Sequence, residues 1–254
     1  MHLADLDPSG TYGFEKADAL KETAEQLVRL GSLQDRLWAE GKRAVLVVLQ
    51  GIDAAGKDGT IQKVMEAFNP QGCVVSSFKV PTTEELAHDF LWRIHKRTPG
   101  KGEFGIFNRS HYEDVLVVRV HGLAPKSVWS KRYDQINDFE QTLALNGTTI
   151  VKFFLSIDRE EQRKRFQARY DDPTKRWKFS LGDLEERKRW DDYQAAFDDM
   201  LSKTSTDWAP WYVIPANRNW LRNLAVSTIL ADTLARLRPA YPAPPDLPAD
   251  LVID

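Results

Sequence analysis

The chain lacks the features that would place it outside a reducing compartment or within a membrane. It has a single cysteine, Cys73, which excludes an internal disulfide framework and predicts a small buried core residue. No apolar run approaches the ~20 residues that a membrane-spanning helix needs. Residues 1–13 carry acids and no apolar core, so they do not predict a signal peptide. We therefore expect a cytoplasmic protein with no membrane partner.

An excess of charge of one sign is also missing. The 35 basic and 37 acidic residues give a formal net charge of −2 at pH 7. This balance argues against a general nucleic-acid-binding protein, although it is compatible with a local basic patch. With 254 residues the chain is long enough to bury one large core, and we expect a single domain over 1–254.

The sequence does contain an alternation of apolar strands and amphipathic helices. Strands are expected at 45–50, 74–80, 104–107, 149–157 and 211–215. Helices are expected at 14–40, 60–68, 83–97, 112–120, 126–145 and 219–236. Residues 1–14 are expected to be loosely ordered, and the proline-rich segment 239–248 to be an extended arm. The alternation predicts an α/β fold with a parallel sheet, whose ligands bind at the carboxyl ends of the strands.

A glycine-rich turn follows the first predicted strand. Its sequence is Gly51-Ile52-Asp53-Ala54-Ala55-Gly56-Lys57-Asp58-Gly59-Thr60, and it has the G-x-x-x-x-G-K spacing of a Walker A motif, or P-loop. Glycines let backbone N–H groups turn toward an anion, and the following helix start adds unpaired donors. Lys57 supplies a mobile positive charge. Asp58 stands where Ser or Thr usually binds Mg²⁺, which indicates a different metal arrangement or an unusual phosphate substrate. A strand–helix turn that contains lysine by chance is the alternative.

A second polar cluster follows the third predicted strand. It reads Asn108-Arg109-Ser110-His111-Tyr112-Glu113-Asp114 and takes the place of a Walker B motif, whose aspartate normally holds Mg²⁺. Because Asn108 is neutral, we expect Asp53 and Glu113 to bind the metal. Arg109 is expected to clamp phosphate, with a surface ion pair as its alternative. His111 is expected to pack or to form a hydrogen bond rather than to act as a base.

The segment 158–200 lies between the fourth and fifth predicted strands and is expected to form a helical lid. Its residues 159–189 include eleven basic and seven acidic side chains. Arginines that close over a P-loop neutralise a transferring phosphoryl group and exclude water. Arg165 and Arg169 share one helix face, and Arg165 either reaches phosphate or pairs only with Glu161. The alternative for the segment is two solvated helix faces of mixed charge.

These motifs together resemble the polyphosphate kinase 2 family, from about Leu20 to Arg236. They are the P-loop with Asp58, Lys79-Val80-Pro81-Thr82, the cluster at 108–114 and, in the lid, Arg169, Asp172-Pro173, Arg176-Trp177-Lys178-Phe179-Ser180 and Trp190-Asp191-Asp192-Tyr193. Aspartate after the P-loop lysine is typical of that family. Many members have Asp where this chain has Asn108, so the resemblance assigns no metal to residue 108.

The resemblance implies a three-layer α/β/α P-loop kinase fold related to thymidylate kinases, with a helical lid. It also implies Mg²⁺-dependent, reversible phosphoryl transfer from inorganic polyphosphate to ADP. The string Asn-Arg-Ser-x-Tyr-Glu resembles the subgroup that accepts nucleoside mono- and diphosphates, which extends the expectation to AMP. By position, Asp53, Lys57, Arg109 and Arg169 are marked as catalytic. Guanine nucleotides are further candidate substrates, and a homo-oligomer is expected.

The predicted phosphate- and nucleotide-binding set joins the P-loop to nearby basic and polar residues. It consists of Gly51, Ala54, Ala55, Gly56, Lys57, Asp58, Gly59, Thr60, Lys63, Lys79, Asn108 and Lys178. Two other functions remain open at this point. An ATP-dependent nucleoside monophosphate kinase needs a base-specific acceptor pocket, whereas a non-catalytic phosphate-binding regulatory module has little use for several lid arginines.

Overall fold

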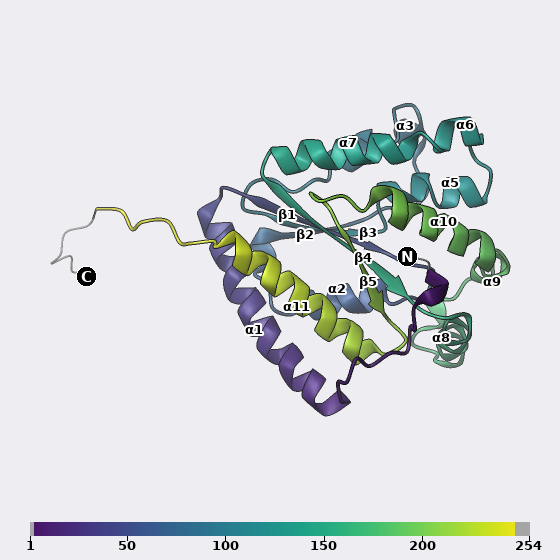
Figure 1. Cartoon of the computed structure of the whole chain (residues 1–254), viewed down its shortest axis with the longest axis horizontal. Coiled ribbons are helices and arrows are strands. Elements are labelled where there is room, and N and C mark those ends of the chain that lie inside the picture. The colour runs from purple at the N-terminus through teal and green to yellow at the C-terminus, as the bar shows by residue number, and fades with distance from the viewer. Residues whose placement is uncertain (1–2, 247–254) are drawn as a thin grey trace.

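A computed structural model describes residues 3–246 of the chain (Figure 1). Five parallel strands form one sheet in the order β2-β3-β1-β4-β5. Their bounds are β1 Ala44–Gln50, β2 Cys73–Ser77, β3 Phe104–Asn108, β4 Thr148–Ser156 and β5 Trp211–Pro215. Every residue of β1 is buried, because this central strand is covered on both faces. The P-loop follows β1, so the predicted phosphate site lies near the middle of the sheet.

Helices cover both faces of the sheet (Figure 1). On one face lie α1 (Lys16–Glu40), α2 (Lys57–Met65) and α11 (Asn219–Leu237). The other face is covered by α7 (Arg132–Leu145) and α10 (Trp190–Thr204). The expected helical extension at 14–40 corresponds to α1, which packs along α11. These layers confirm the predicted α/β/α fold.

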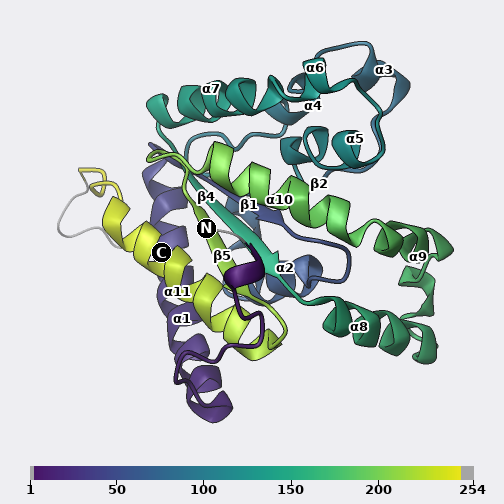
Figure 2. The ribbon, with the colours of Figure 1, turned by 45° about the vertical axis from the view of Figure 1, so that its right-hand side comes forward.

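Shorter elements connect the layers or lie beyond the strand ends. They are η1 Leu3–Asp5, η2 Pro70–Gly72, α3 Thr83–Leu86, α4 Trp92–His95, η3 His111–Asp114, α5 Val117–Val120, α6 Lys126–Trp129, α8 Arg159–Asp171, η4 Arg176–Lys178 and α9 Leu181–Lys188. Figure 2 shows α8 and α9 projecting beyond the carboxyl end of β4. Side-chain caps begin both helices: Asp158 accepts the N–H of Glu161 at 2.7 Å, and Ser180 accepts the N–H of Gly182 at 3.1 Å.

Three predicted helices are interrupted in the structure. The helix expected at 83–97 divides into α3 and α4, because the Asp89 carboxylate accepts the N–H of Leu91 at 3.0 Å and replaces a helical bond with a turn. The helix expected at 112–120 divides into η3 and α5, and that at 126–145 into α6 and α7. The strand expected at 74–80 ends at Ser77.

The N-terminal segment is more ordered than its sequence predicts. Leu3 is buried and its N–H donates to Asp198 at 2.8 Å. The N–H of Asn217 donates to the carbonyl of Pro8 at 3.1 Å. The prediction of loose order is therefore wrong for residues 3–14, which are held by tertiary contacts that a local pattern does not contain.

At the other end, residues 239–246 form neither helix nor strand, as predicted. The hydroxyl of Tyr241 donates to Asp35 at 2.7 Å, so the start of this segment rests on α1. The rest of the predicted arm, 247–248, lies outside the described residues.

Cys73 packs in the core as expected, and burial raises the pKa of its thiol to about 12. Within residues 3–246, no helix combines the length and apolarity that crossing a membrane requires.

Candidate active site

The P-loop connects the end of β1 to the start of α2. Gly51 has φ of 150°, and a Cβ there would lie 2.7 Å from the carbonyl oxygen of Leu155, so glycine lets the end of β1 approach β4. Ala54 and Gly56 also have positive φ, 66° and 107°, which turns the loop back toward the helix. The first N–H groups of α2 have no partner within the helix. The loop and helix start therefore have the backbone geometry that suits an anion.

Lys57 is buried and held by its own loop. Its Nζ donates to the carbonyl of Gly51 at 2.6 Å and to that of Ile52 at 3.4 Å. Burial and the nearby Arg109 lower the pKa of Lys57 to about 8, against the opposing carboxylates of Asp53 and Glu113. The Lys57 ammonium is thus held at the P-loop by two neutral backbone carbonyls. A phosphate oxygen, which carries negative charge, can replace them.

Arg109 joins the two carboxylates that the sequence predicts as metal ligands. One guanidinium nitrogen is ion-paired with Asp53, and the other lies 3.2 Å from Oε2 of Glu113. Burial would lower the pKa of Arg109, but Glu113 and Asp53 raise it above its ordinary value. The three predicted side chains therefore meet beside the P-loop, although they come from two separate segments.

The side chain of Asn108 contacts the P-loop directly. Its amide nitrogen donates to Asp58 at 2.8 Å. The other carboxylate oxygen of Asp58 lies 3.9 Å from Nζ of Lys178 in the lid segment. Asp58, which replaces the usual hydroxyl residue, thus connects the end of β3, the P-loop and η4.

A cavity of about 760 Å³ lies over the P-loop. It is lined by Asp53, Ala54, Gly56, Lys57, Asp58, Gly59, Ser77, Phe78, Lys79, Asn108, Arg109, Arg165, Ala168, Arg169, Lys175, Lys178, Asp183, Asn219 and Arg222. Eight of these residues are Lys or Arg and three are Asp, so the cavity is strongly positive in a chain whose net charge is −2. A concave site of this charge is suited to a polyanion.

Several predicted residues lie beside this cavity without lining it. Gly51 and Glu113 line a smaller pocket that also contains Asp53 and Arg109. Ala55 is fully buried, and the hydroxyl of Thr60 donates back to the carbonyl of Gly56 at 3.1 Å. These two residues therefore support the shape of the loop.

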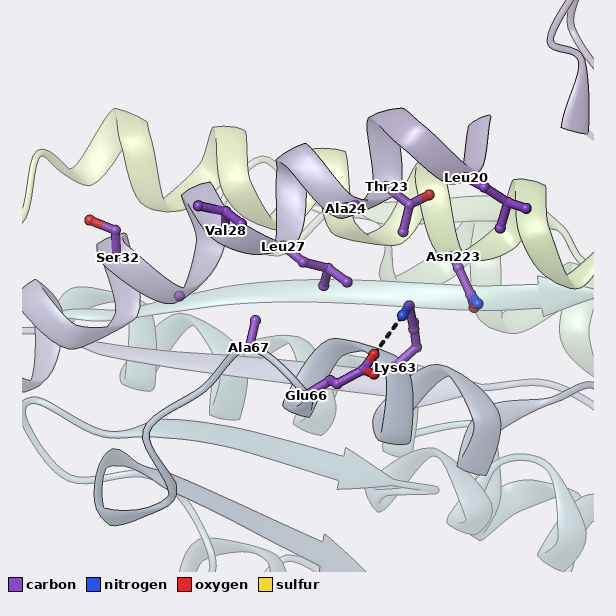
Figure 3. Close-up of a pocket in the computed structure, with 11 residues that line it drawn as sticks. Leu20, Thr23, Ala24, Leu27, Val28, Ser32, Lys63, Glu66, Ala67 and Asn223 are labelled. Atoms are coloured by element: carbon purple, nitrogen blue, oxygen red, sulfur yellow. Dashed lines mark hydrogen bonds and ion pairs between the residues drawn. The ribbon is translucent and has the colours of Figure 1, made fainter. Parts of the chain in front are cut away.

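Lys63, another predicted phosphate ligand, faces away from this cavity. Six residues beyond Lys57 on α2, it lies on a different side of that helix. It pairs with Glu66 at 2.5 Å, and both line a second cavity of about 510 Å³ between α1, α2 and α11 (Figure 3). The structure corrects the assignment of Lys63 to phosphate binding.

Arg165 has a larger part in the site than its sequence context indicates. The predicted pair with Glu161 is present at 2.7 Å. In addition, Nη1 donates to the carbonyls of Ala54 at 3.0 Å and Ala55 at 2.9 Å. The other terminal nitrogen donates to the carbonyls of Ala216 and Asn217. Arg165 therefore fastens α8 to the P-loop and to the end of β5.

Arg222, at the start of α11, is a site residue that sequence analysis missed. It is buried, and Nη1 donates to the side chain of Asn219 at 2.9 Å. A Cβ on Gly56 would lie 2.0 Å from the same nitrogen, so glycine makes room for the guanidinium. Burial, and then Arg165, lower the pKa of Arg222 to about 10. Its position just after the last strand was the only sequence signal for it.

Arg169 lines the cavity one helical turn beyond Arg165. Its guanidinium packs 5.7 Å from the ring centroid of Phe166. Among the described residues, no carboxylate lies within ion-pair distance of Arg169. Its charge is therefore available to an anion, whereas that of Arg165 is committed to the loop.

A parallel sheet with a P-loop after its central strand, and a basic cavity lined in part by α8 and η4, has the fold and site of a P-loop phosphotransferase. The sequence profile described as "Polyphosphate kinase 2 (PPK2)" matches residues 13–241. The chain therefore belongs to the polyphosphate kinase 2 family, as its motifs indicated.

Individual relatives agree with this assignment. The chain is 56% identical over 256 residues to the AMP/ADP-polyphosphate phosphotransferase of Meiothermus ruber, and the alignment covers 100% of this chain and 96% of that protein. It is 50% identical over 229 residues to the ADP-polyphosphate phosphotransferase of Rhodopseudomonas palustris, and this alignment covers 85% of this chain and 79% of that protein. The crystal structure of polyphosphate kinase 2 from Arthrobacter aurescens TC1 matches with a TM-score of 0.93 at 47% identity, covering 100% of this chain and 90% of that one.

Proposed function

We propose that this protein transfers the terminal phosphoryl group of inorganic polyphosphate to ADP, which forms ATP, and also to AMP. The observation that carries the proposal is the 760 Å³ cavity over the P-loop, which eight cationic side chains line. A single triphosphate needs fewer cations than this, whereas a linear polyphosphate presents negative charge along its whole length. The names of the relatives from Meiothermus ruber and Rhodopseudomonas palustris support both acceptors.

In the proposed reaction, an oxygen of the acceptor's terminal phosphate attacks the terminal phosphorus of polyphosphate. A new P–O bond forms as the bond to the shortened polyphosphate breaks. Lys57 and the loop N–H groups hold phosphate oxygens, and Arg109 and Arg169 neutralise charge on the migrating group. We propose that the projecting part of the segment 158–200, from α8 to α9, acts as a lid that excludes water from this step. The expectation that the lid extends to residue 200 is corrected, because α10 packs its Trp190, Tyr193 and Phe197 into the core. The reverse reaction uses the same contacts.

Mg²⁺ fits the carboxylate pair Asp53 and Glu113. Both carboxylates contact the guanidinium of Arg109, so their oxygens lie close to one positively charged group beside the P-loop. Mg²⁺ is commonly held by one or two carboxylates together with phosphate oxygens and water. Within residues 3–246 no cluster of three or more His, Cys, Asp or Glu side chains could hold a metal ion. Bound Mg²⁺ would supply charge neutralisation on the transferring phosphates.

We expect Asp53→Asn and Glu113→Gln each to raise the Mg²⁺ concentration for half-maximal rate by about tenfold or more. Asn108→Ala should have a smaller effect, because Asn108 is bonded to Asp58. Mg²⁺ titrations of ATP formation measure both shifts. Loss of activity in Asn108→Ala together with an unchanged Mg²⁺ requirement in Glu113→Gln would contradict this ligand assignment.

The pKa of Lys57, about 8, predicts a loss of activity at alkaline pH. The ammonium is charged below that pH and loses its proton above it, so kcat/KM for polyphosphate should fall as pH rises through about 8. A rate profile from about pH 6.5 to 9.5 would show the fall. Lys57→Arg, which stays protonated, should move the fall to higher pH; a flat wild-type profile would show that Lys57 does not titrate in this range.

The assay that tests the function supplies ADP, long-chain polyphosphate and Mg²⁺ as the only substrates and follows ATP by luminescence. We expect sustained ATP formation, and formation of ADP when AMP replaces ADP. Phosphorylation of AMP only when ATP, and not polyphosphate, is the donor would identify a nucleoside monophosphate kinase instead. Tight polyphosphate binding without turnover would identify a regulatory module. A cytoplasmic location, use of guanine nucleotides and assembly as a homo-oligomer stay predictions.

A further inference from the structure

Four polar side chains form a sealed cluster beneath the turn that carries Arg109. They are His111, Tyr112, Glu140 from α7 and Lys152 from β4, and each is fully buried. Nζ of Lys152 lies 2.6 Å from Oε2 of Glu140 and donates to the hydroxyl of Tyr112 at 2.8 Å. Oε1 of Glu140 accepts from that hydroxyl at 2.7 Å and lies 3.1 Å from Nε2 of His111. All four side chains therefore belong to one hydrogen-bond network.

Stability alone does not account for this cluster. A buried ion pair loses its hydration, and replacing such a pair with well-packed apolar residues is often neutral or stabilising. Burial lowers the pKa of His111 and raises that of Tyr112, so both remain neutral and the cluster retains one anion and one cation. A network of this kind does specify one arrangement of its members, because each donor has a fixed acceptor.

Two members of the network, His111 and Tyr112, lie in the sequence between two residues of the candidate site, Arg109 and Glu113. Along the turn, Arg109 and Glu113 face the P-loop, while His111 and Tyr112 between them face the cluster. Arg109 has φ of 61°, a conformation that is uncommon for a residue with a side chain. The turn must hold this conformation for its guanidinium to lie between Asp53 and Glu113.

The same cluster also fixes the helix that returns from the lid segment. Nζ of Lys152 donates to the carbonyl of Thr204, at the end of α10, at 2.7 Å. The indole of Trp211 on β5 donates to the hydroxyl of Thr204 at 2.9 Å. The turn and the base of α10 therefore share one anchor on β4.

We propose that the buried Glu140–Lys152 pair, through Tyr112 and His111, positions the 109–113 turn so that Arg109 is held at the phosphates during transfer. The inference rests on the proposed phosphotransferase activity. Glu140, Lys152, Tyr112 and His111 are positioning residues, because the cluster is sealed from the cavity and touches no substrate.

Tyr112→Phe is the main test, since it removes one hydroxyl and keeps the ring that packs on Trp211. We expect kcat to fall about tenfold, as for a small displacement of a catalytic group, with KM for ADP within about twofold of wild type. Tyr133→Phe is the matched control: Tyr133 is also buried on the α7 side, but its hydroxyl meets Arg119 at 3.4 Å, away from the turn. Its single, longer hydrogen bond predicts a smaller loss of thermal stability than in Tyr112→Phe, and it should keep its kcat.

A second pair of variants tests the other hydrogen bond to Glu140. His111→Leu removes the donor and should lower kcat about tenfold, whereas His111→Gln keeps an N–H at a similar reach and should restore most of it. This comparison decides the question even if Tyr112→Phe does not fold.

A double-mutant cycle with Arg109→Lys separates positioning from general destabilisation. If Tyr112 acts through Arg109, adding Tyr112→Phe to Arg109→Lys should change kcat by less than about twofold. A full tenfold further loss, or folded Tyr112→Phe and His111→Leu proteins with wild-type kcat, would overturn the inference. Failure of the wild-type protein to form ATP from polyphosphate would instead reject the proposed function, so the two results are distinguishable.

Discussion

Lys57→Ala is expected to lower kcat for ATP formation by at least about two orders of magnitude, the usual cost of removing a charge contact that stabilises a transition state. The ammonium is buried at the P-loop turn, where it donates hydrogen bonds to the carbonyls of Gly51 and Ile52. After the substitution, water from the adjoining cavity can reach those carbonyls. The melting temperature should therefore change by only a few degrees, and steady-state rates with saturating ADP and polyphosphate measure the effect.

Lys63→Ala is the matched control on the same helix. Lys63 pairs with Glu66 near the surface and lines the second cavity rather than the site. An exposed pair of this kind is worth about 0–1 kcal/mol, so both turnover and stability should stay close to wild type. Similar losses in the two variants, or near-normal turnover in folded Lys57→Ala, would remove the P-loop lysine from the mechanism.

Arg169→Ala is the second substitution with a large expected effect. We expect kcat to fall by about 100-fold or more, because this guanidinium lines the cavity and has no carboxylate partner among the described residues. The melting temperature should be nearly unchanged, since few folded-state contacts are lost. Arg169→Lys should recover only part of the rate, because lysine keeps the charge but not the planar two-pronged donor.

Arg165→Ala should behave differently, although Arg165 lies one turn earlier on the same helix. Its sequence context predicts a weak effect, but the structure shows hydrogen bonds to P-loop carbonyls and to the end of β5. Losing two of these four charged hydrogen bonds would by itself cost roughly 3 kcal/mol, or about 6–12 °C in melting temperature. Thermal scans beside rate measurements distinguish the two arginines. Arg163→Ala is the control, because Arg163 is exposed and pairs only with Glu160.

Equal and small effects of Arg169→Ala and Arg163→Ala would indicate that α8 presents a solvated charged face and not a phosphate contact. A large stability loss in Arg169→Ala would likewise contradict the assignment, because it would reveal a structural partner.

Much of the fold was predictable because its signals are local. The five strands are short apolar runs separated by helical patterns, and all five were located to within a few residues. The breaks inside the predicted helices were harder to foresee. For example, α3 ends at Leu86, and the Asp89 carboxylate then accepts the N–H of Leu91 in a turn before α4, a bond that competes with helix formation.

The candidate site was predictable in part for the same reason. The P-loop and the Asn108–Asp114 cluster are contiguous strings whose spacing expresses their chemistry. Both strings were expected at the carboxyl ends of strands, but only the structure shows that these two strands are neighbours and that Arg109 pairs with Asp53. Lys63 was assigned wrongly because sequence proximity to Lys57 does not say which side of α2 a residue faces.

The sequence by itself thus determined the phosphate-binding turn, the order of the strands and helices along the chain and the types of side chain available for phosphoryl transfer. These follow from spacing over a few residues, where backbone geometry is nearly fixed. The tertiary structure alone decided that Arg165 holds the P-loop, that Arg222 fills the space beside Gly56 and that Glu140 meets Lys152 under the catalytic turn. Each of these contacts joins separate elements, and packing of the layers, rather than any local pattern, brings them together.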